Sequence, residues 1–342
     1  MHTGEHRHAR SLNIKELAAS KQITSLGATF EMTNQTNRPA SESTHASRRG
    51  FIKTTSGLVA AGAAVSPAHG WSDELADGST RVLIVVGPSS HPPGTHEVAA
   101  GGRLMKHALE QIENLSGIQA DVVEGWPEKS LRDAASTVVF IGDLFPPNRL
   151  PNPQQNLADL DEMMQRGVGI ACIHYATGLL GDDVTPDGDH PLLKWMGGYF
   201  ANRSCPHHES FARVFPKATI TPVETDHPVT RGWKEFTLRD EPYFNNYFGA
   251  DGNQVAPKAT VLATSMLPPE APKRETVAWC IEREDTGRGF GVVMPHYYKN
   301  WRDEDLRRLI LNGIVWSAKI DVPAGGVKTD SPNLADFDPK SV

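Results

Sequence analysis

The sequence predicts an α/β protein with a doubly wound, mainly parallel sheet and helices on both faces. From Ser79 onward, short apolar runs alternate with amphipathic segments, which is typical of a βαβ series. The run Arg81–Val86 is almost entirely apolar, as expected for a strand buried on both faces. Histidines follow several of these runs, at the positions where such sheets place their binding sites.

The expected elements follow in order along the chain. Strands are expected at 81–86, 118–123, 138–141, 169–173, 211–215, 219–223, 260–264, 277–283 and 290–294. Helices are expected at 98–114, where Gly101 and Gly102 would allow close contact with the sheet, and at 157–164. The Pro- and Asp-rich stretch 182–254 is expected to decorate the crevice, and 284–287 to form a hairpin turn. Asp303 is expected to cap a closing helix that ends near Lys319.

The N-terminal region has the composition of a leader and not of a folded domain. We expect a disordered leader at 1–46, with Met32 as an alternative start, and a twin-arginine signal at 47–70. The signal contains Arg48-Arg49, a weakly apolar segment too short to span a bilayer, and a small-residue cleavage region. The domain is then expected at 79–325, followed by an extended tail at 326–342. These features predict export through the twin-arginine pathway to the periplasm or beyond, without stable membrane insertion.

Charge and motif content exclude several classes of function. Removal of residues 1–70 takes away eight basic and four acidic residues, which changes the formal net charge from −7 to −11. A chain of that charge repels nucleic acid and anionic lipid. Walker, GxGxxG, HExxH and paired CxxC motifs are absent, so no nucleotide cofactor is expected. The sequence does not indicate an oligomeric state.

A histidine occupies the position of a nucleophile in the segment 169–178, GIACIHYATG. An apolar strand runs into a turn with His174 at its tip and the small residues Cys172 and Ala176 two positions away on each side. Small flanking residues are what a strained nucleophile elbow requires. His174 is therefore predicted to project over the end of the sheet, as a base or a metal ligand.

Other histidines are predicted to reach the same edge. His91 and His96 follow the first strand, and His296 follows the strand at 290–294. Because the carboxyl ends of parallel strands open into one crevice, these side chains are expected to line a common pocket. A single loop histidine is more often solvated than catalytic, so the prediction depends on their coincidence.

Eight sequence blocks, in order, resemble the trehalose-utilisation (ThuA-like) family over roughly residues 80–325. They are SHPPGTHE, GWP, GVGIACIHYA, WMGGYF, DHPVTRG, DEPYF, GRGFG with PHYYKNW, and LNGIVWSA. The resemblance implies a fold like that of class I glutamine amidotransferases, with histidine in place of the nucleophilic cysteine. It also implies processing of oxidised sugars such as 3-keto-glycosides, with a metal associated with some members.

The resemblance implies a set of site residues: His91, His96, His174, His207, Asp240, Glu241 and His296. This sequence departs from the family pattern in two blocks. It has SHPPGTHE where the family has SHGYGEHE, and DEPYFNNYF where the family has DEWYYHMRF. Pro242 removes a backbone donor, and a family histidine becomes Asn245 or Asn246. Both changes affect substrate specificity more than fold.

The chemistry of a 3-keto-glycoside assigns roles to these residues. Its acidified C2 proton allows base abstraction followed by loss of the C1 substituent, by elimination or in a hydrolysis. We expect His174, Glu241, His296 and Asp240 to be catalytic, and Tyr243, Trp126, Tyr297 and Trp301 to bind the sugar. A divalent transition metal such as zinc would be held from among His91, His96, His174, His207 and Glu241.

Two alternatives compete with this metal-assisted carbohydrate enzyme. One is a sugar-binding or scaffold protein that has kept the fold and lost turnover. The other is an amidotransferase or cysteine hydrolase, which is disfavoured because the elbow carries His174 while Cys172 lies inside the strand. For both the carbohydrate enzyme and the sugar-binding protein, the expected partner is a small carbohydrate.

Overall fold

The computed structural model describes residues 79–223, 226–251 and 253–341. The predicted leader at 1–46 and twin-arginine signal at 47–70 lie outside the described residues. Within the described ranges, no helix has both the length and the apolar character needed to cross a membrane.

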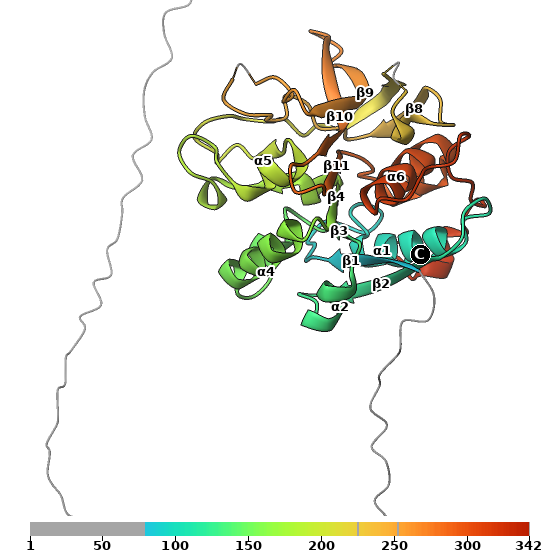
Figure 1. Cartoon of the computed structure of the whole chain (residues 1–342). Helices are drawn as coiled ribbons and strands as arrows, with labels where there is room; N and C mark the ends of the chain where they lie inside the picture. Colours follow the sequence, from blue (N-terminus) through green and yellow to red (C-terminus); the bar gives the residue numbers. More distant parts are fainter. Residues whose placement is uncertain (1–78, 224–225, 252, 342) are drawn as a thin grey trace, which may run out of the picture. The chain divides into compact units, whose positions relative to one another are not determined.

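A nine-stranded sheet forms the centre of the domain, in the order β2-β1-β3-β4-β11-β10-β9-β7-β8 (Figure 1). Its parallel half consists of β1 (Thr80–Val86), β2 (Ile118–Glu124), β3 (Thr137–Ile141), β4 (Gly169–Ile173) and β11 (Arg288–Val292). Its antiparallel half adds β10 (Lys273–Glu282), β9 (Ala259–Leu267), β7 (Phe215–Pro222) and β8 (Phe236–Asp240). A separate pair joins β5 (Gly178–Leu179) to β6 (Phe200–Ala201).

Helices cover both faces of this sheet. Figure 1 shows α1 and α6 on one face and α4 and α5 on the other. The α-helices are α1 (Val98–Glu110), α2 (Lys129–Ala134), α3 (Pro146–Arg149), α4 (Pro153–Gln165), α5 (Pro191–Met196) and α6 (Glu304–Ser317). Short 3₁₀ helices are η1 (His174–Thr177), η2 (Gly181–Asp183), η3 (Pro228–Thr230), η4 (Tyr298–Arg302) and η5 (Leu334–Phe337). The predicted fold class, a doubly wound α/β three-layer arrangement, is confirmed.

The two glycines of α1 have the predicted role. A Cβ atom at Gly101 would lie 2.8 Å from Ile141 Cδ1, and one at Gly102 would lie 2.8 Å from Val86 Cγ2. Helix α1 therefore packs against β1 and β3 at a distance that larger residues would prevent. The predicted cap of α6 is also present, because the Asp303 carboxylate accepts a hydrogen bond from the Leu306 amide.

Two segments are more ordered than the sequence pattern indicates. The stretch 182–254 does not only decorate the crevice, since it also contributes β7 and β8 to the main sheet. The C-terminal tail, expected to be extended, instead forms η5 and packs along α1, where Arg103 donates to the Phe337 carbonyl and Glu97 accepts from the Lys340 amide. Buried Val327 and Leu334 anchor it. The two buried residues are seven positions apart with mostly polar residues between them, so the sequence of the tail shows no periodic pattern that would predict its packing.

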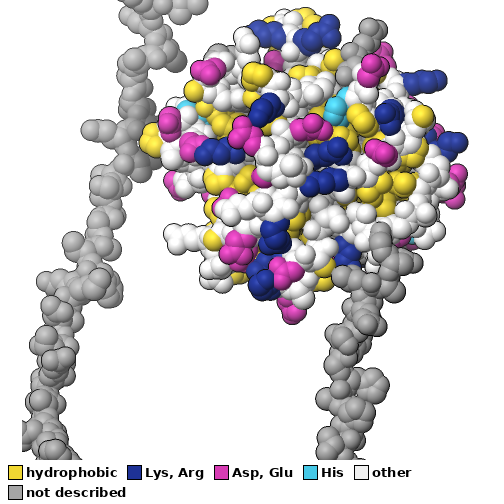
Figure 2. Space-filling model, in the orientation of Figure 1, with side chains coloured by type: hydrophobic (Ala, Val, Ile, Leu, Met, Phe, Trp, Pro, Cys, Tyr) yellow, Lys and Arg dark blue, Asp and Glu magenta, His cyan; other side chains and the backbone are white. Residues whose placement is uncertain are grey.

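Basic and acidic side chains are intermixed on the face of the domain shown in Figure 2. Several form ion pairs on exposed elements, such as Arg213 with Glu270. Surface pairs of this kind contribute little to stability, with typical values of about 0–1 kcal/mol. The apolar sheet and its helices therefore account for most of the stability.

A buried histidine predicts how stability depends on pH. His190 caps α5 through Nδ1, which accepts from the Leu192 amide, and burial lowers its pKa from 6.5 to about 4. As pH falls below 6.5, His190 becomes protonated in the unfolded chain but stays neutral in the folded chain until about pH 4. The free energy of unfolding therefore decreases between these two pH values. We expect His190→Asn, which keeps a cap acceptor, to remove up to about 3 kcal/mol of this acid destabilisation. Urea unfolding at pH 7 and pH 4.5 measures it, and equal pH dependence in both proteins would contradict the assignment.

Candidate active site

The carboxyl ends of the adjacent parallel strands β1, β3, β4 and β11 bring the polar side chains of the site together. His91 and His96 follow β1, His174 follows β4 and His296 follows β11, all at one edge of the sheet. Glu241 comes from the antiparallel half, directly after β8. The crevice predicted from the strand ends is thus present, with one carboxylate that reaches it from the other half of the sheet.

His174 has the backbone conformation of an elbow tip. Its φ is +52°, in the left-handed region that is costly for a residue with a Cβ. Cys172 and Ala176 are fully buried on either side, and the Thr177 hydroxyl donates to the His174 carbonyl. The strand turns into the 3₁₀ helix η1 instead of a long helix. The small-x-histidine-x-small pattern therefore marks a strained turn.

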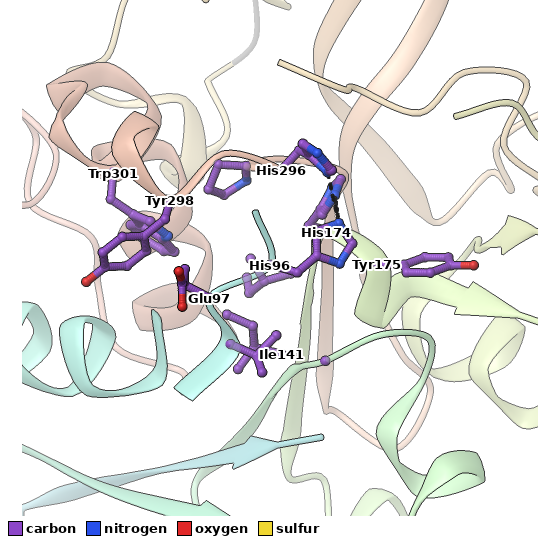
Figure 3. A pocket seen from close by; sticks show the side chains of 12 residues that line it. His96, Glu97, Ile141, His174, Tyr175, His296, Tyr298 and Trp301 are labelled. Atoms are coloured by element: carbon purple, nitrogen blue, oxygen red, sulfur yellow. Dashed lines mark hydrogen bonds between the residues drawn. The ribbon is translucent and has the colours of Figure 1, made fainter. Parts of the chain in front are cut away.

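Three imidazoles converge at the centre of the site. His96 Nε2 lies 2.9 Å from His174 Nε2 and 2.9 Å from His296 Nδ1. Glu241 Oε2 is 3.2 Å from His296 Nδ1 and 4.0 Å from His174 Nε2. Figure 3 shows the three histidines turned toward one another, with Glu97, Tyr298 and Trp301 across the pocket. One nitrogen or oxygen from each of the four residues lies within 4.8 Å of the others, as donors to a single ion would.

Outer hydrogen bonds determine the tautomers of two of these rings. His174 Nδ1 lies 2.9 Å from the Val293 carbonyl, which only accepts, so Nδ1 carries the proton. His96 Nδ1 lies 2.6 Å from Asp143 Oδ1 and likewise donates. Both Nε2 atoms then present lone pairs to each other at 2.9 Å. No neutral tautomer places a proton between them while both outer hydrogen bonds remain.

Burial keeps the two rings neutral. The pKa of His174 is lowered well below its usual 6.5, first by burial and then by the neighbouring histidines. The pKa of His96 is also lowered by burial, against the opposing hydrogen bond to Asp143. Burial alone would raise the pKa of Asp143, but hydrogen bonds from His96, the Ser90 amide and His91 lower it to about 2. A carboxylate and two neutral imidazoles are therefore present at neutral pH.

Asp240 positions the site and does not face its centre. It is 1% exposed, and its carboxylate accepts from the amides of Glu241 and His296 and from the Asn300 side chain. These hydrogen bonds hold two residues of the cluster at their backbones. The catalytic role predicted for Asp240 is therefore not supported by its geometry, since its oxygens are already engaged.

The predicted sugar-binding aromatics lie in different places. Tyr243 stacks on His174 with ring centroids 4.6 Å apart, and its hydroxyl is 3.1 Å from His174 Nε2. Trp301 is buried and lines a small cavity beside His96. Tyr297 is next to His296 but lines a separate groove, and Trp126 donates to Asp159 on α4. Trp126 lines neither of the cavities described below, so its predicted substrate role is not supported by its geometry.

His207, expected as a metal-ligand candidate, is not part of the cluster. Its Nε2 forms a hydrogen bond with the Tyr199 hydroxyl at 2.8 Å, and its ring packs against Tyr247.

Cys172 does not offer an alternative nucleophile, because it is fully buried inside β4 and burial raises its pKa.

Asp143 is the site residue that the sequence analysis missed. It follows β3 and binds both His91, at 2.8 Å, and His96, at 2.6 Å. The rule that selected the histidines, a polar residue just after a parallel strand, also applies to the motif IGD at 141–143. It was missed because aspartate after a strand is common in turns.

Two cavities adjoin the cluster. The first, beside His96, His174 and His296, measures about 20 Å³, enough for one water-sized group. The second measures about 310 Å³ and is lined by His91, Tyr175, Phe200, Asn202, Arg203, Glu209, Ser210, Phe211, Ala212, Glu241 and Tyr243. Aromatic faces and hydrogen-bonding groups share this larger cavity, which has the size of a small-ligand site. Glu241 and His91 connect it to the cluster.

Comparisons with known proteins agree with this architecture. A family model described as "ThuA: Trehalose utilisation" matches residues 81–317, which confirms the resemblance predicted from the sequence. A ThuA-like protein from Bacteroides uniformis is similar in structure, with 14% identity over 75% of this chain and 98% of that chain and a TM-score of 0.51. A search of curated proteins found no match.

Two further solved structures are similar at lower TM-scores. A ThuA-like protein from Parabacteroides merdae has 16% identity over 75% of this chain and 94% of that chain, with a TM-score of 0.46. A glutamine amidotransferase from Thermotoga maritima has 12% identity over 71% of this chain and 97% of that chain, with a TM-score of 0.38.

The positive φ of His174 predicts an unusual order of stability among its variants. His174→Ala keeps a Cβ in the left-handed region, whereas His174→Gly removes it. We expect the glycine variant to be more stable than the alanine variant by about 1 kcal/mol, which corresponds to a melting temperature about 2–4 °C higher. Thermal unfolding measures both proteins. At an ordinary turn position alanine would be the more stable, and that order would contradict a strained elbow.

Proposed function

We propose that this chain, which belongs to the ThuA (trehalose utilisation) family, is an enzyme that cleaves oxidised carbohydrates with the help of a divalent metal ion. The family description connects the chain with carbohydrate metabolism. The finer proposal is that the substrate is a 3-keto-glycoside. One observation supports the metal-assisted enzyme: the lone pairs of His96 and His174 face each other, as two ligands of one ion would. The cavity beside them is large enough for a sugar ring.

The donor set fits a metal ion such as zinc. His96, His174 and His296 would hold the ion beside Glu241, and three histidines that leave a fourth position open to substrate are typical of catalytic zinc sites. Hydrogen bonds from the outer nitrogens to Asp143 and to the Val293 carbonyl are what metal-binding histidines usually have. When bound, the ion would polarise the C3 ketone and so acidify the C2 proton.

The residues that face the larger cavity can carry the proton transfers. Glu241 lines the cavity and takes the proton from C2 as the base. His91, which Asp143 orients through Nδ1, acts as the acid in its imidazolium form and donates the Nε2 proton to the glycosidic oxygen. The C2–H and C1–O bonds break, a C1=C2 double bond forms, and the leaving alcohol departs with the proton from His91.

Aromatic side chains support binding of a sugar in the same cavity. Tyr175, Phe200 and Tyr243 form one wall, and their rings pack edge-on or tilted against one another. Phe211 stands at the rim, 42% exposed, and packs on Phe244. An exposed ring face next to polar groups is suited to the apolar face of a sugar.

We also propose export through the twin-arginine pathway, on the basis of Arg48-Arg49 and the weakly apolar segment after them. Cargo on that route is folded before transport, which is compatible with a metal acquired inside the cell. Replacement of both arginines by lysine would trap the precursor if the proposal holds.

The metal proposal predicts a specific effect at Asp143. Elemental analysis of the purified protein should give about one transition metal per chain. We expect Asp143→Asn to lower metal affinity about 10- to 100-fold, because the amide no longer holds the His96 tautomer as a carboxylate does. Asp159→Asn is the matched control, since Asp159 accepts similar side-chain hydrogen bonds away from the cluster. Equal affinity in both variants, measured by competition with a chelator, would argue against the site.

The catalytic proposal predicts loss of turnover at Glu241. We expect Glu241→Gln to cleave methyl 3-keto-glucoside about 10²- to 10⁴-fold more slowly than the parent protein, because the amide cannot accept the C2 proton. Glu284→Gln, at the exposed hairpin turn, should keep full activity. A metal-loaded parent protein that binds the glycoside without turning it over would identify a sugar-binding protein and refute the enzyme.

A further inference from the structure

A second large cavity lies behind the histidine cluster and takes no part in the proposed reaction. It measures about 490 Å³ and is lined by Pro93, Gly94, Thr95, Arg239, Tyr297, Tyr298, Lys299, Arg302, Leu334, Ala335 and Ser341. The loop before α1, the end of β8, η4 and the C-terminal tail together form it. We call it the basic groove.

Three cations line the basic groove, and no Asp or Glu side chain is among its described lining residues. Arg239, Lys299 and Arg302 are exposed, and none of them forms an ion pair with any residue in the described ranges. Most other arginines of the described part do pair with Asp or Glu, for example Arg132 with Asp159. Three positive charges around one cavity, unpaired within the described part of a chain of net charge −7, produce a local field that attracts anions.

An aromatic ring lies between two of these cations. The Arg239 guanidinium is 4.6 Å from the centre of the Tyr297 ring, and Lys299 Nζ is 5.5 Å from it. Tyr298, Leu334 and Pro93 add apolar surface to the walls. The groove thus offers positive charge beside a flat apolar wall, a combination that suits an anion carried on a ring.

The backbone connects the basic groove with the site. Thr95 and Tyr297 form an antiparallel bridge, and the adjacent His96 amide donates to the His296 carbonyl at 3.0 Å. Thr95 and Tyr297 line the groove, while His96 and His296 line the cavity of the cluster. The two pockets therefore share one short backbone wall, and a ligand in the groove contacts residues bonded directly to two of the clustered histidines.

We propose that the basic groove is a binding site for a small organic anion, a carboxylate or phosphate monoester attached to a ring. The cations bind the anionic group through charge-assisted hydrogen bonds, and the ring packs on the apolar part of the wall that includes Pro93, Tyr298 and Leu334. The site is separate from the one proposed for the glycoside, so it does not depend on the proposed reaction.

The test is calorimetric titration of the full chain with glucuronate, glucose 6-phosphate and glucose. We expect saturable binding of at least one anion, and the two anions distinguish a carboxylate from a phosphate ligand. The double variant Lys299→Gln/Arg302→Gln should weaken that binding at least about tenfold, because it removes two charge-assisted hydrogen bonds to the anion. The control Lys273→Gln/Arg274→Gln removes two exposed cations from β10, outside the groove, and should leave affinity unchanged. Binding of glucose, which has no anionic group, should be the same in the parent protein and in the groove variant.

Amide NMR spectra of the same titration locate the ligand. Signals of Thr95 and Tyr297 should shift on binding in the parent protein and stay fixed in the groove variant. Absence of saturable binding by both anions would overturn the proposal, as would equal affinity in the groove and control variants. Binding that shifts only residues of the larger cavity, such as Phe211, would also overturn it.

Discussion

Two imidazole lone pairs that face each other at 2.9 Å are the constraint on which the site depends. Each ring is held in this orientation from outside, His174 by the Val293 carbonyl and His96 by Asp143. Burial disfavours a second proton on either ring. The arrangement lacks a positive charge between the two nitrogens, and this is the charge that the proposed metal ion would supply.

The sheet explains how residues so distant in sequence reach this point. Adjacent parallel strands end at one edge, so single residues after β1, β3, β4 and β11 meet without long loops. The antiparallel half then places Glu241 against His296, and Asp240 secures both residues by accepting from their amides. Strain at His174 is maintained because Cys172 and Ala176 are packed on all sides. The fold and the chemistry are thus linked through backbone hydrogen bonds as much as through side chains.

The basic groove and the larger cavity beside the histidine cluster differ in chemical character. One side presents Glu241, His91 and aromatic rings, which suit a neutral sugar ring. The other side presents Arg239, Lys299 and Arg302, which suit an anion. Alternation of side chains along the short bridge between Thr95 and Tyr297 places neighbouring residues in different pockets. The proposed glycoside site and the proposed anion site therefore differ in charge, although both lie next to residues of the histidine cluster.

The α/β alternation, the elbow at His174 and the convergence of His91, His96 and His296 could be predicted from the sequence, because apolar runs and strand-end positions are local features. The family resemblance identified Glu241 but also His207, which bonds with Tyr199 elsewhere. Only the tertiary structure decided that Trp126 faces α4, that Asp240 points into backbone amides and that Asp143 orients two histidines. The physical reason is that the direction of a polar side chain depends on partners supplied by distant segments, and no periodicity in the chain records which partners those are.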